Sequence, residues 1–454
     1  MNATEKRSVL ALASVYGSRM LGLFMVLPVF VLLGRDLDGA TPMLLGMALG
    51  AYGLSQALLQ IPFGMLSDRL GRKPLIYLGL VLFAAGSLLA GLSDSIYGVL
   101  AGRILQGAGA IASVLMALAS DLTREENRTL AMAMLGLSIG LAFALSLVLG
   151  PLVGHWYGLS GIFFLTAFFA LIGIVLTAAV VPTPEARLHQ PDALPARGQI
   201  RQVLTSTRLM RLDAGIFCLH LILTAAFLVV PIVLENNLGL ARSGHWWVYL
   251  SAMGVGFVTM LPLMILAEKK RRVKGVMILS VSILAVAVAL MGFSMSSLMA
   301  FWPTLFLFFL GFNLLESLLP SLISKEAPAA GKGSAMGVYS TSQFLGAFVG
   351  GALGGWSSGA AGVSGVIVLM LATALIWLII VATMAQPSYA SSMALRLDPA
   401  WPGEPLEIRR ALMAIPGVDD AVVLAETEEA WLKVDRHRLS EEALWRLSFV
   451  QKQG

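Results

Sequence analysis

Four ionisable side chains lie inside long apolar stretches of this sequence: Arg19, Arg103, His220 and Glu316. A charged side chain at the centre of a bilayer costs about 2.5–3.5 kcal/mol on insertion scales, so such residues mark function by default. A buried glutamate whose cavity opens to one side and then the other can bind and release a proton, and a histidine titrates near neutral pH. We expect Glu316 to carry a coupling proton, with His220 assisting. The alternative is a structural ion pair of Glu316 with one of the two arginines.

Polar residues at helical spacing accompany these four. Asn313 precedes Glu316 by three residues and therefore shares its helix face. Tyr52, Gln56 and Gln60 follow one another at intervals of four on one face of an apolar stretch. These side chains either line a central cavity or bond neighbouring helices, and their spacing leaves both interpretations open. For Arg103 the alternative to a functional role is a purely structural bond between helices.

The composition predicts an all-α membrane protein. Hydrophobic residues make up 57% of the chain and charged residues 13%, and the mean hydropathy is +0.83, whereas soluble domains carry about 25% charged residues. A spanning helix needs roughly 20 apolar residues. Twelve such stretches can be placed, at about 8–34, 41–66, 74–92, 96–120, 129–154, 161–182, 212–234, 245–267, 275–293, 298–324, 334–356 and 362–385.

Basic residues predict the orientation of these spans. Nineteen lysines and arginines fall in the turns on the side of the N-terminus, against two, Arg35 and Arg242, in the opposite turns. Basic turns stay in the cytoplasm, so we expect both termini there. The net charge of +5 mostly reflects this asymmetry and is no indication of nucleic-acid binding. The expected partners are the lipid bilayer, protons and a small-molecule substrate.

The lone cysteine limits the chemistry further. Cys218 lies within a predicted span, and a single cysteine excludes an intramolecular disulfide and a cysteine metal cage. The chain contains no Gly-x-x-x-x-Gly-Lys-Ser/Thr phosphate loop, which argues against an ATP-driven pump. We therefore expect no metal, no cofactor and no enzymatic reaction.

A charged turn separates the second and third predicted spans. Gly64 and Asp68 share a helix face, so a neighbouring helix can approach at the glycine and meet the aspartate. We expect that neighbour to be the eleventh span, whose positive N-terminal end begins near Ser334. Asp121, at the end of the fourth span, could pair with an arginine of the turn or cap the next helix. The residues of this group are Gly64, Asp68, Arg69, Gly71, Arg72, Lys73 and Asp121.

The chain divides into two related halves and a tail. Residues 183–211 directly follow Pro182 and contain three further prolines, Pro184, Pro191 and Pro195, and five arginines. We interpret them as a linker between six-helix halves at 1–182 and 212–385. Ser113 and Ser317 match at an offset of 204 residues, as do Leu115 and Leu319. Parallel repeats of this kind build one class of transporter, with the substrate site between the halves. The repeat also argues against a channel.

These motifs resemble those of the major facilitator superfamily. The turn at 64–74 is similar to its signature A, Arg103 with Gln106-Gly107 to signature B, and residues 19–28 to the first-helix signature of drug exporters. Signature C, typical of antiporters, is matched by a set that includes Gly140, Gly150, Pro151 and Gly154.

The resemblance implies a twelve-helix fold, a latch at signature A that holds the halves together in one state, and a seal at signature C. We expect the fifth span to bend there and pack against the eighth. It also implies a proton-coupled antiporter of a bacterial inner membrane that exports small lipophilic or drug-like molecules. The alternative is a membrane sensor built on a transporter scaffold, with the tail as its output.

The tail at 392–454 has a different composition, with 11 of the 26 acidic and 8 of the 31 basic residues. Its pattern predicts the order strand, helix, strand, strand, helix, which suggests a small α+β ferredoxin-like domain. It resembles the YAM domain, a relative of heavy-metal-associated domains, but it has no cysteine for their Cys-x-x-Cys loop. Its negative charge argues against RNA binding. Its ligand or partner is not predicted.

Overall fold

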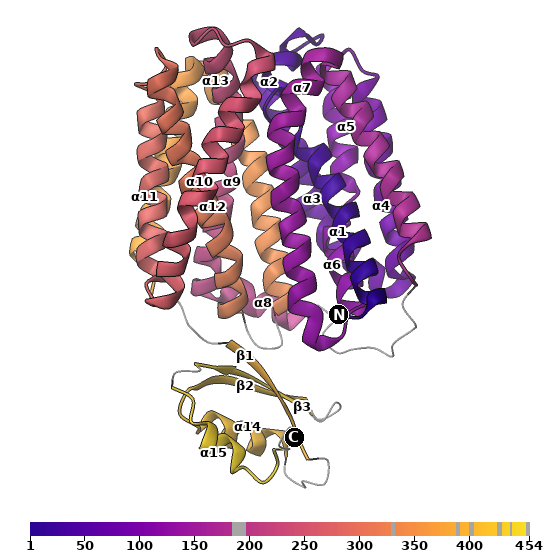
Figure 1. Ribbon diagram of the computed structural model, residues 1–454, viewed down its shortest axis with the longest axis vertical. Coiled ribbons are helices and arrows are strands. Elements are labelled where there is room, and N and C mark those ends of the chain that lie inside the picture. The colour runs from indigo at the N-terminus through magenta and orange to yellow at the C-terminus, as the bar shows by residue number, and fades with distance from the viewer. Residues whose placement is uncertain are drawn as a thin grey trace.

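The computed structural model describes residues 1–454 except 184–196, 328–331, 387–390, 399–403, 425–428, 436–437 and 451–454. A bundle of long helices stands above a small domain formed by the end of the chain (Figure 1). The N-terminus lies at the end of the bundle that faces this domain. We call that end the terminal face and the opposite end the distal face.

The first half of the bundle comprises seven helices and one 3-10 turn: α1 (Ala3–Phe24), α2 (Phe30–Leu33), η1 (Gly34–Asp36), α3 (Pro42–Leu70), α4 (Arg72–Gly91), α5 (Ile96–Ala108), α6 (Ala112–Asp121) and α7 (Glu125–Ala179). Local chemistry fixes several ends. Thr41 caps α3 by accepting from the Leu44 backbone N–H at 3.2 Å, and Pro42 occupies the first turn, where its missing N–H is harmless. Gly71, at φ 94°, separates α3 from α4.

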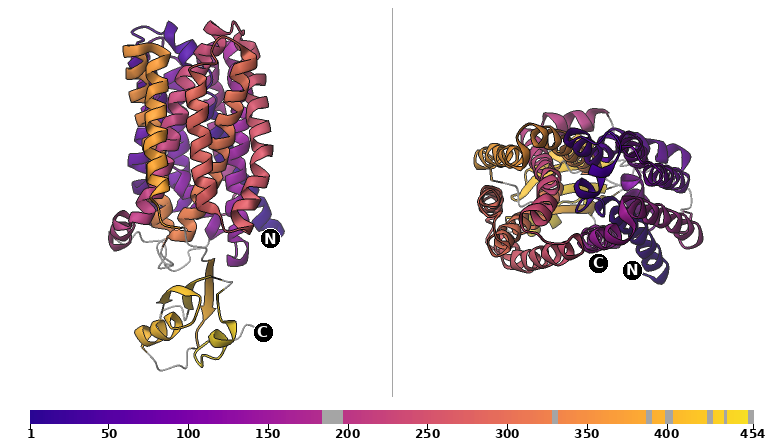
Figure 2. Two further views of the ribbon diagram at one scale, coloured as in Figure 1. Left: turned by 90° about the vertical axis from the view of Figure 1, so that its left-hand side faces the viewer. Right: turned by 90° about the horizontal axis from the view of Figure 1, so that it is seen from above.

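The second half comprises α9 (Thr207–Ile232), η3 (Val233–Asn237), η4 (Arg242–Gly244), α10 (His245–Lys269), α11 (Val273–Met291), α12 (Leu298–Glu326) and α13 (Lys332–Ala382). Figure 2 shows the helices of the two halves side by side when the bundle is viewed from above. A further helix, α8 (Arg197–Thr205), lies within the predicted linker, and α9 begins at Thr207 rather than at residue 212.

Nine helical stretches of the described residues are long and apolar enough to cross a membrane. Two of these are 50 residues long, and each is broken: α7 at Gly158 and α13 at Ala361 and Gly362. Counting each broken helix as two spans and adding α1 gives the twelve spans that the sequence predicts. The predicted all-helical membrane fold is thereby confirmed.

The two halves meet closely at the distal end of α3 and the first part of α13. A Cβ placed on Gly50 would lie 2.8 Å from the Cα of Phe348, and one on Gly355 would lie 2.6 Å from the carbonyl oxygen of Pro42. Gly46 and Gly351 also face each other so closely that a Cβ on either would clash with the backbone of the other helix. Only glycine allows two helix backbones to approach so closely, so these residues bring the halves into contact.

The small domain comprises β1 (Ser391–Arg396), α14 (Pro405–Met413), β2 (Val418–Leu424), β3 (Glu429–Val434) and α15 (Glu441–Trp445). Its sheet has the order β1-β3-β2 with antiparallel neighbours, in the register Leu395↔Ala430 and Ala421↔Leu432. A bridge between Leu397 and Val450 lies where a fourth strand would join β1. This is the predicted ferredoxin-like arrangement.

The small domain contacts the second half of the bundle through the end of β3. Asp435 accepts two hydrogen bonds from the Arg271 guanidinium, at 2.6 and 3.0 Å, and the Lys433 ammonium donates to the Lys325 carbonyl oxygen at 2.6 Å. Arg271 lies between α10 and α11, and Lys325 lies in the last turn of α12. The domain is therefore attached to two neighbouring ends of the same half.

Candidate functional site

Glu316 of α12, His220 of α9 and Gln343 of α13 meet inside the second half. The Gln343 amide nitrogen lies 3.3 Å from Glu316 Oε1 and 2.9 Å from His220 Nε2, and His220 Nε2 lies 3.9 Å from Glu316 Oε2. An amide nitrogen is a donor only, so the histidine nitrogen that faces it is the acceptor. Gln343 thus joins the two predicted proton carriers. The sequence analysis did not select it, although a polar amide within an apolar span was a usable signal.

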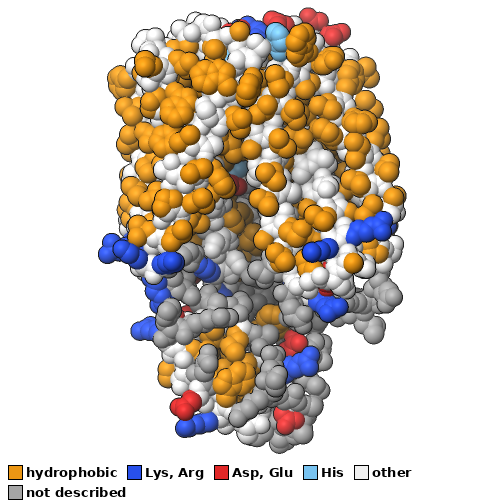
Figure 3. Space-filling model, in the orientation of Figure 1, with side chains coloured by type: hydrophobic (Ala, Val, Ile, Leu, Met, Phe, Trp, Pro, Cys, Tyr) orange, Lys and Arg blue, Asp and Glu red, His pale blue; other side chains and the backbone are white. Residues whose placement is uncertain are grey.

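A cleft reaches this part of the bundle. Figure 3 shows the surface hollowed between the two halves from about mid-height toward the terminal face, with acidic and histidine atoms visible at its depth. The Glu316 side chain is 37% exposed and that of His220 is 11% exposed. Asn313, one turn away, is buried and its amide nitrogen has no partner among the described residues. A titratable carboxyl therefore borders a space that is open to the terminal face.

The first half buries Arg19, which is 1% exposed. Its guanidinium donates to Gln56 Oε1 at 2.8 Å and to the Gly109 carbonyl oxygen at 2.7 Å, and it lies 5.6 Å from the ring centre of Tyr52 and 5.3 Å from that of Phe83. Two of its nitrogens, Nε and one terminal nitrogen, have no partner among the described residues. The charge is thus held by amide, carbonyl and aromatic groups.

Arg103 is buried in the same half. Its guanidinium donates to the carbonyl oxygens of Ala48 and Leu49 and, at 3.0 Å, to Gln106 Oε1. No carboxylate pairs with either arginine among the described residues. The alternative of a Glu316–arginine ion pair is wrong for this conformation, because Glu316 faces groups of its own half.

The polar face of α3 is packed rather than open. Tyr52 and Gln60 are 1% and 2% exposed, and the Gln56 amide donates to Gln60 Oε1 at 3.3 Å. The Tyr52 ring also meets Phe344 of α13 edge-on, with ring centres 6.2 Å apart. Of the two interpretations left open by the spacing, bonding between neighbours describes these side chains in this conformation.

The charged turn forms an ion-pair cluster at the terminal face. The Arg72 guanidinium contacts the Asp68 carboxylate, lies 3.2 Å from Asp121 Oδ2, and donates to Ser67 Oγ at 2.6 Å. These residues belong to α3, α4 and α6, which are all elements of the first half. The arginine of the turn that pairs with Asp121 is therefore Arg72.

Among the contacts of the described residues, the predicted one between Asp68 and the start of the eleventh span near Ser334 is not found. Asp68 is held by Arg72 instead, and a Cβ on Gly64 would meet Ser113 of α6, in the same half. Figure 3 shows the surface hollowed between the two halves toward this end of the bundle. This signature therefore makes contacts within one half here.

The remaining residues of the turn lie at the surface. Arg69 is exposed, and the Lys73 ammonium donates to the Val181 carbonyl oxygen at 2.8 Å. That bond connects the start of α4 to the second residue after α7.

The glycines of the fifth span contact a different partner from the one expected. A Cβ on Gly150 would lie 2.5 Å from the carbonyl oxygen of Met25, just after α1, and one on Gly154 would also meet side chains that follow α1. Gly140 has nothing within 4 Å of such an atom, and α7 continues as a helix through Pro151. Although α7 does contact α10, Gly150 and Gly154 pack against the first span and not the eighth.

An ion-pair cluster joins the two halves at the distal face. Glu235 of η3 lies 2.9 Å from the Arg35 guanidinium of η1 and 2.7 Å from the Arg242 guanidinium of η4. Arg35 belongs to the first half and the other two residues to the second. The two isolated basic residues of the distal turns therefore share one carboxylate, and the sequence analysis missed that carboxylate.

This geometry defines a class of protein. Two helical halves enclose buried ionisable groups, touch at the distal face and part at the terminal face, as in membrane transporters that alternate access to a central site.

Comparison with known proteins identifies the family. Residues 12–351 match the model of the Major Facilitator Superfamily, and the chain belongs to that family. It is 46% identical over 440 residues to the inner membrane transport protein YajR of Escherichia coli (strain K12), covering 96% of this chain and 95% of that one. It is 26% identical over 338 residues to the multidrug resistance protein MdtH of Aeromonas salmonicida (strain A449), covering 73% and 82% of the two chains.

A solved structure shares the fold. The crystal structure of a bacterial homologue of the human lysosomal transporter Spinster, described as inward-facing and unoccupied, superposes with a TM-score of 0.65 at 14% identity, over 84% of this chain and 96% of that one. The resemblance predicted from the sequence is confirmed at the level of the family. The chain is a membrane transporter and not an enzyme.

Proposed function

We propose that this chain is a proton-coupled antiporter that exports small lipophilic molecules across a bacterial inner membrane, with both termini in the cytoplasm. The terminal face is then cytoplasmic and the conformation is open to the cytoplasm. The excess of basic residues supports this orientation, and Figure 3 shows lysine and arginine side chains in a band near the terminal end of the bundle. Two relatives, the inner membrane transport protein YajR and the multidrug resistance protein MdtH, support the membrane and the substrate class.

The observation that carries the proposal is the position of Glu316. Its side chain borders the cleft, and it contacts an amide and a neutral histidine nitrogen rather than a cation. Among the described residues, no permanently charged cation contacts its carboxylate. A carboxyl in such a place can take up a proton on one side of the membrane and lose it on the other.

The apolar surroundings fit a lipophilic substrate. Phe312 precedes Glu316 by one turn, and its ring lies 5.9 Å from that of Phe143 in the first half and 6.2 Å from that of His220. Aromatic groups from both halves thus meet beside the carboxyl, so a flat apolar molecule bound there would contact both halves.

Ethidium efflux tests the proposal. Inside-out vesicles that contain the native chain, Glu316→Gln or Glu326→Gln receive an imposed proton gradient, and ethidium fluorescence is followed. Glu326 lies on the same helix but pairs with Arg208 at 3.6 Å near its end, so its substitution is the matched control. We expect gradient-driven transport by the native chain and the control, and loss of at least tenfold in Glu316→Gln.

Two other outcomes of this experiment would each contradict a part of the proposal. Undiminished gradient-driven transport by Glu316→Gln would exclude Glu316 as the coupling group. If neither ethidium nor any of a broad panel of lipophilic cations were transported by the native chain, the export of such molecules would be contradicted. The sensor alternative would then gain support, because the small domain is attached to the same half that carries Glu316.

A further inference from the structure

Gln343 of α13 bonds to both titratable groups of the site through one atom. Its amide nitrogen lies 3.3 Å from Glu316 Oε1 and 2.9 Å from His220 Nε2. The carboxylate and the imidazole do not bond to each other, because the 3.9 Å between Glu316 Oε2 and His220 Nε2 is too long for a hydrogen bond. Among the described residues, the amide is therefore the group that connects them.

The other ionisable side chains that α9 to α13 bury make no hydrogen bond to these three residues among the described contacts. They are Asp213 and Cys218 of α9, His245 and Tyr249 of α10, and Tyr339 of α13. The Asp213 carboxylate and both tyrosine hydroxyls have no partner among the described residues, and His245 bonds to the Leu240 carbonyl oxygen. The lysines and arginines of these helices lie near the terminal face. The hydrogen-bonding partner that Glu316 and His220 share is thus the amide.

Backbone contacts between α9 and α13 fix the distance between the histidine and the amide. A Cβ on Gly346 of α13 would collide with the Phe217 carbonyl oxygen of α9, and one on Gly350 would collide with that of Leu221. Phe217 and Leu221 lie on either side of His220 along α9. Because the two helices are held together at both points, the amide responds by rotating about its own side-chain bond rather than by moving with its helix.

Rotation of the Gln343 amide by half a turn exchanges the positions of its nitrogen and its oxygen. With the nitrogen facing the two groups, the amide donates to both, which suits an ionised Glu316 and a His220 whose hydrogen is on Nδ1. With the oxygen facing them, the amide accepts from both, which requires a protonated Glu316 and a hydrogen on His220 Nε2. Gln343 is half-buried, so water can bond to the amide atom that points away.

We propose that Gln343 is a positioning residue whose amide makes the protonation of Glu316 and the position of the hydrogen on His220 change together. This inference rests on the proposed function, in which Glu316 takes up the coupling proton. When Glu316 binds one proton from the cleft, the amide rotates and the ring hydrogen of His220 moves from Nδ1 to Nε2. The ring gains no charge, because an imidazolium beside a neutral carboxyl would be buried without a counterion. His220 Nδ1 has no hydrogen-bond partner among the described residues, so it loses no bond when it gives up its hydrogen.

Spectroscopy on purified full-length protein in liposomes tests this coupling. Nitrogen NMR of labelled histidine reports which ring nitrogen carries the hydrogen, and His220→Gln identifies the signals of His220 among the five histidines. The infrared band of a protonated carboxyl, assigned with Glu316→Gln, reports Glu316. In the native protein we expect both signals to change at the same pH. In Gln343→Met, which removes the amide at nearly equal length, the His220 signals should stay unchanged while Glu316 titrates.

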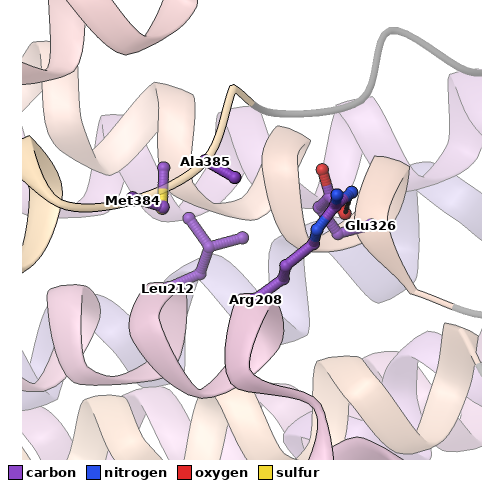
Figure 4. A pocket seen from close by; sticks show the side chains of 5 residues that line it. All are labelled: Arg208, Leu212, Glu326, Met384 and Ala385. Carbon is purple, nitrogen blue, oxygen red and sulfur yellow. Dashed lines mark ion pairs between the residues drawn. The ribbon is translucent and has the colours of Figure 1, made fainter.

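Two matched controls should keep the native coupling. Glu326→Gln removes a second acid of α12, which pairs with Arg208 at 3.6 Å. Figure 4 shows this pair in a surface pocket that is lined by Arg208, Leu212, Glu326, Met384 and Ala385. Gln202→Met removes an exposed glutamine of α8.

Native His220 signals that stayed unchanged while Glu316 titrated would overturn the coupling, even if Gln343→Met failed to fold. A joint change that persisted in Gln343→Met would overturn it too, since the coupling would then not pass through the amide. The two proposals fail separately, because these signals do not depend on transport. Gradient-driven ethidium transport that survives in Glu316→Gln contradicts the proposed function, whereas loss of that transport together with independent titration of the two groups contradicts the role of Gln343 alone.

Discussion

At the scale of single residues, Glu5 connects the first turn of α1 to the beginning of α7. Its carboxylate accepts from the backbone N–H groups of Arg124 at 2.9 Å and Asn2 at 2.8 Å, and from the Asn127 amide at 3.2 Å. Asn2 in turn accepts from the Glu5 backbone N–H, which completes a capping box. The residue precedes the first predicted span, so these bonds form at the terminal face.

These hydrogen bonds make the connection between α1 and the beginning of α7 pH-dependent. The hydrogen bond from the Arg124 backbone, followed by that from Asn2, lowers the pKa of Glu5 below its usual value. A lowered pKa in the folded state means that the stabilisation is complete above the pKa of the unfolded chain and is lost as pH falls through the folded value. We expect Glu5→Gln to speed amide exchange at Arg124 on the order of tenfold at pH 7, and the difference from the native chain to shrink below about pH 4.

Hydrogen exchange with Glu442→Gln as a control checks this prediction, since the Glu442 side chain is 86% exposed. A difference between Glu5→Gln and the native chain that persisted unchanged in acid would contradict the assigned role of the charge.

The sequence could identify buried ionisable residues but not their partners. Arg19, Arg103 and His220 are indeed buried, because hydropathy alone shows which charges lie within spans. Helical periodicity relates residues of one helix, such as Asn313 and Glu316. It carries no information on which face meets which neighbour, so the contact of Glu316 with Gln343 required the structure.

At the scale of elements, the contact between α3 and α13 determines whether the distal face can close. Gly50 lies against backbone atoms of Ala347 and Phe348, at 2.8–3.0 Å from an added Cβ. Backbone cannot move aside as a flexible side chain can. A larger residue at this position would therefore hold the two helices apart.

We expect Gly50→Val to shift the protein toward a state that is open at the distal face. Spin labels on Leu92 and Phe293, which are 73% and 87% exposed at the distal ends of the two halves, would report a longer distance between the halves. Gly140→Val is the matched control, because a Cβ there meets nothing within 4 Å. An unchanged distance distribution in folded Gly50→Val would show that this contact does not control closure.

Element boundaries were more predictable than element contacts. Runs of apolar residues revealed the spans, since a bilayer demands about 20 of them in a row. Gly346, Gly350 and Gly354 follow one another at intervals of four on one face of α13, and they pack tightly against Phe217, Leu221 and Leu228 of α9. A small-residue stripe fits many helices equally well, so the sequence could not name its partner.

At the scale of the whole molecule, the sequence does not predict which of the two alternating states the structure shows. One sequence must support both an open and a closed terminal face, so each motif has to serve two sets of contacts. The signature A cluster, which the family resemblance places between the halves, here bonds Asp68, Arg72 and Asp121 within the first half. The halves are instead joined at the other end by Glu235 with Arg35.

The bridge between Arg35 and Glu235 should act as a weak stabiliser of this state. The side chain of Arg35 is 42% exposed, and exposed ion pairs contribute about 0–1 kcal/mol. Glu235→Gln should therefore raise the population with an open distal face by no more than about fivefold. Because the Gly50→Val substitution introduces a steric clash, it should have the larger effect on the distance between labels at Leu92 and Phe293.

The salt dependence distinguishes the loss of the Glu235 charge from other effects of the Glu235→Gln substitution. Since the Debye length falls to about 3 Å at 1 M salt, high salt should move the native chain in the same direction as Glu235→Gln and leave that variant unchanged. Asp94→Asn, an exposed acid in a distal turn of the first half, should behave as the native chain does. If Glu235→Gln instead favoured distal closure, the desolvation of the bridge would outweigh its attraction, and closure would depend on the glycine contacts of α3 and α13 alone.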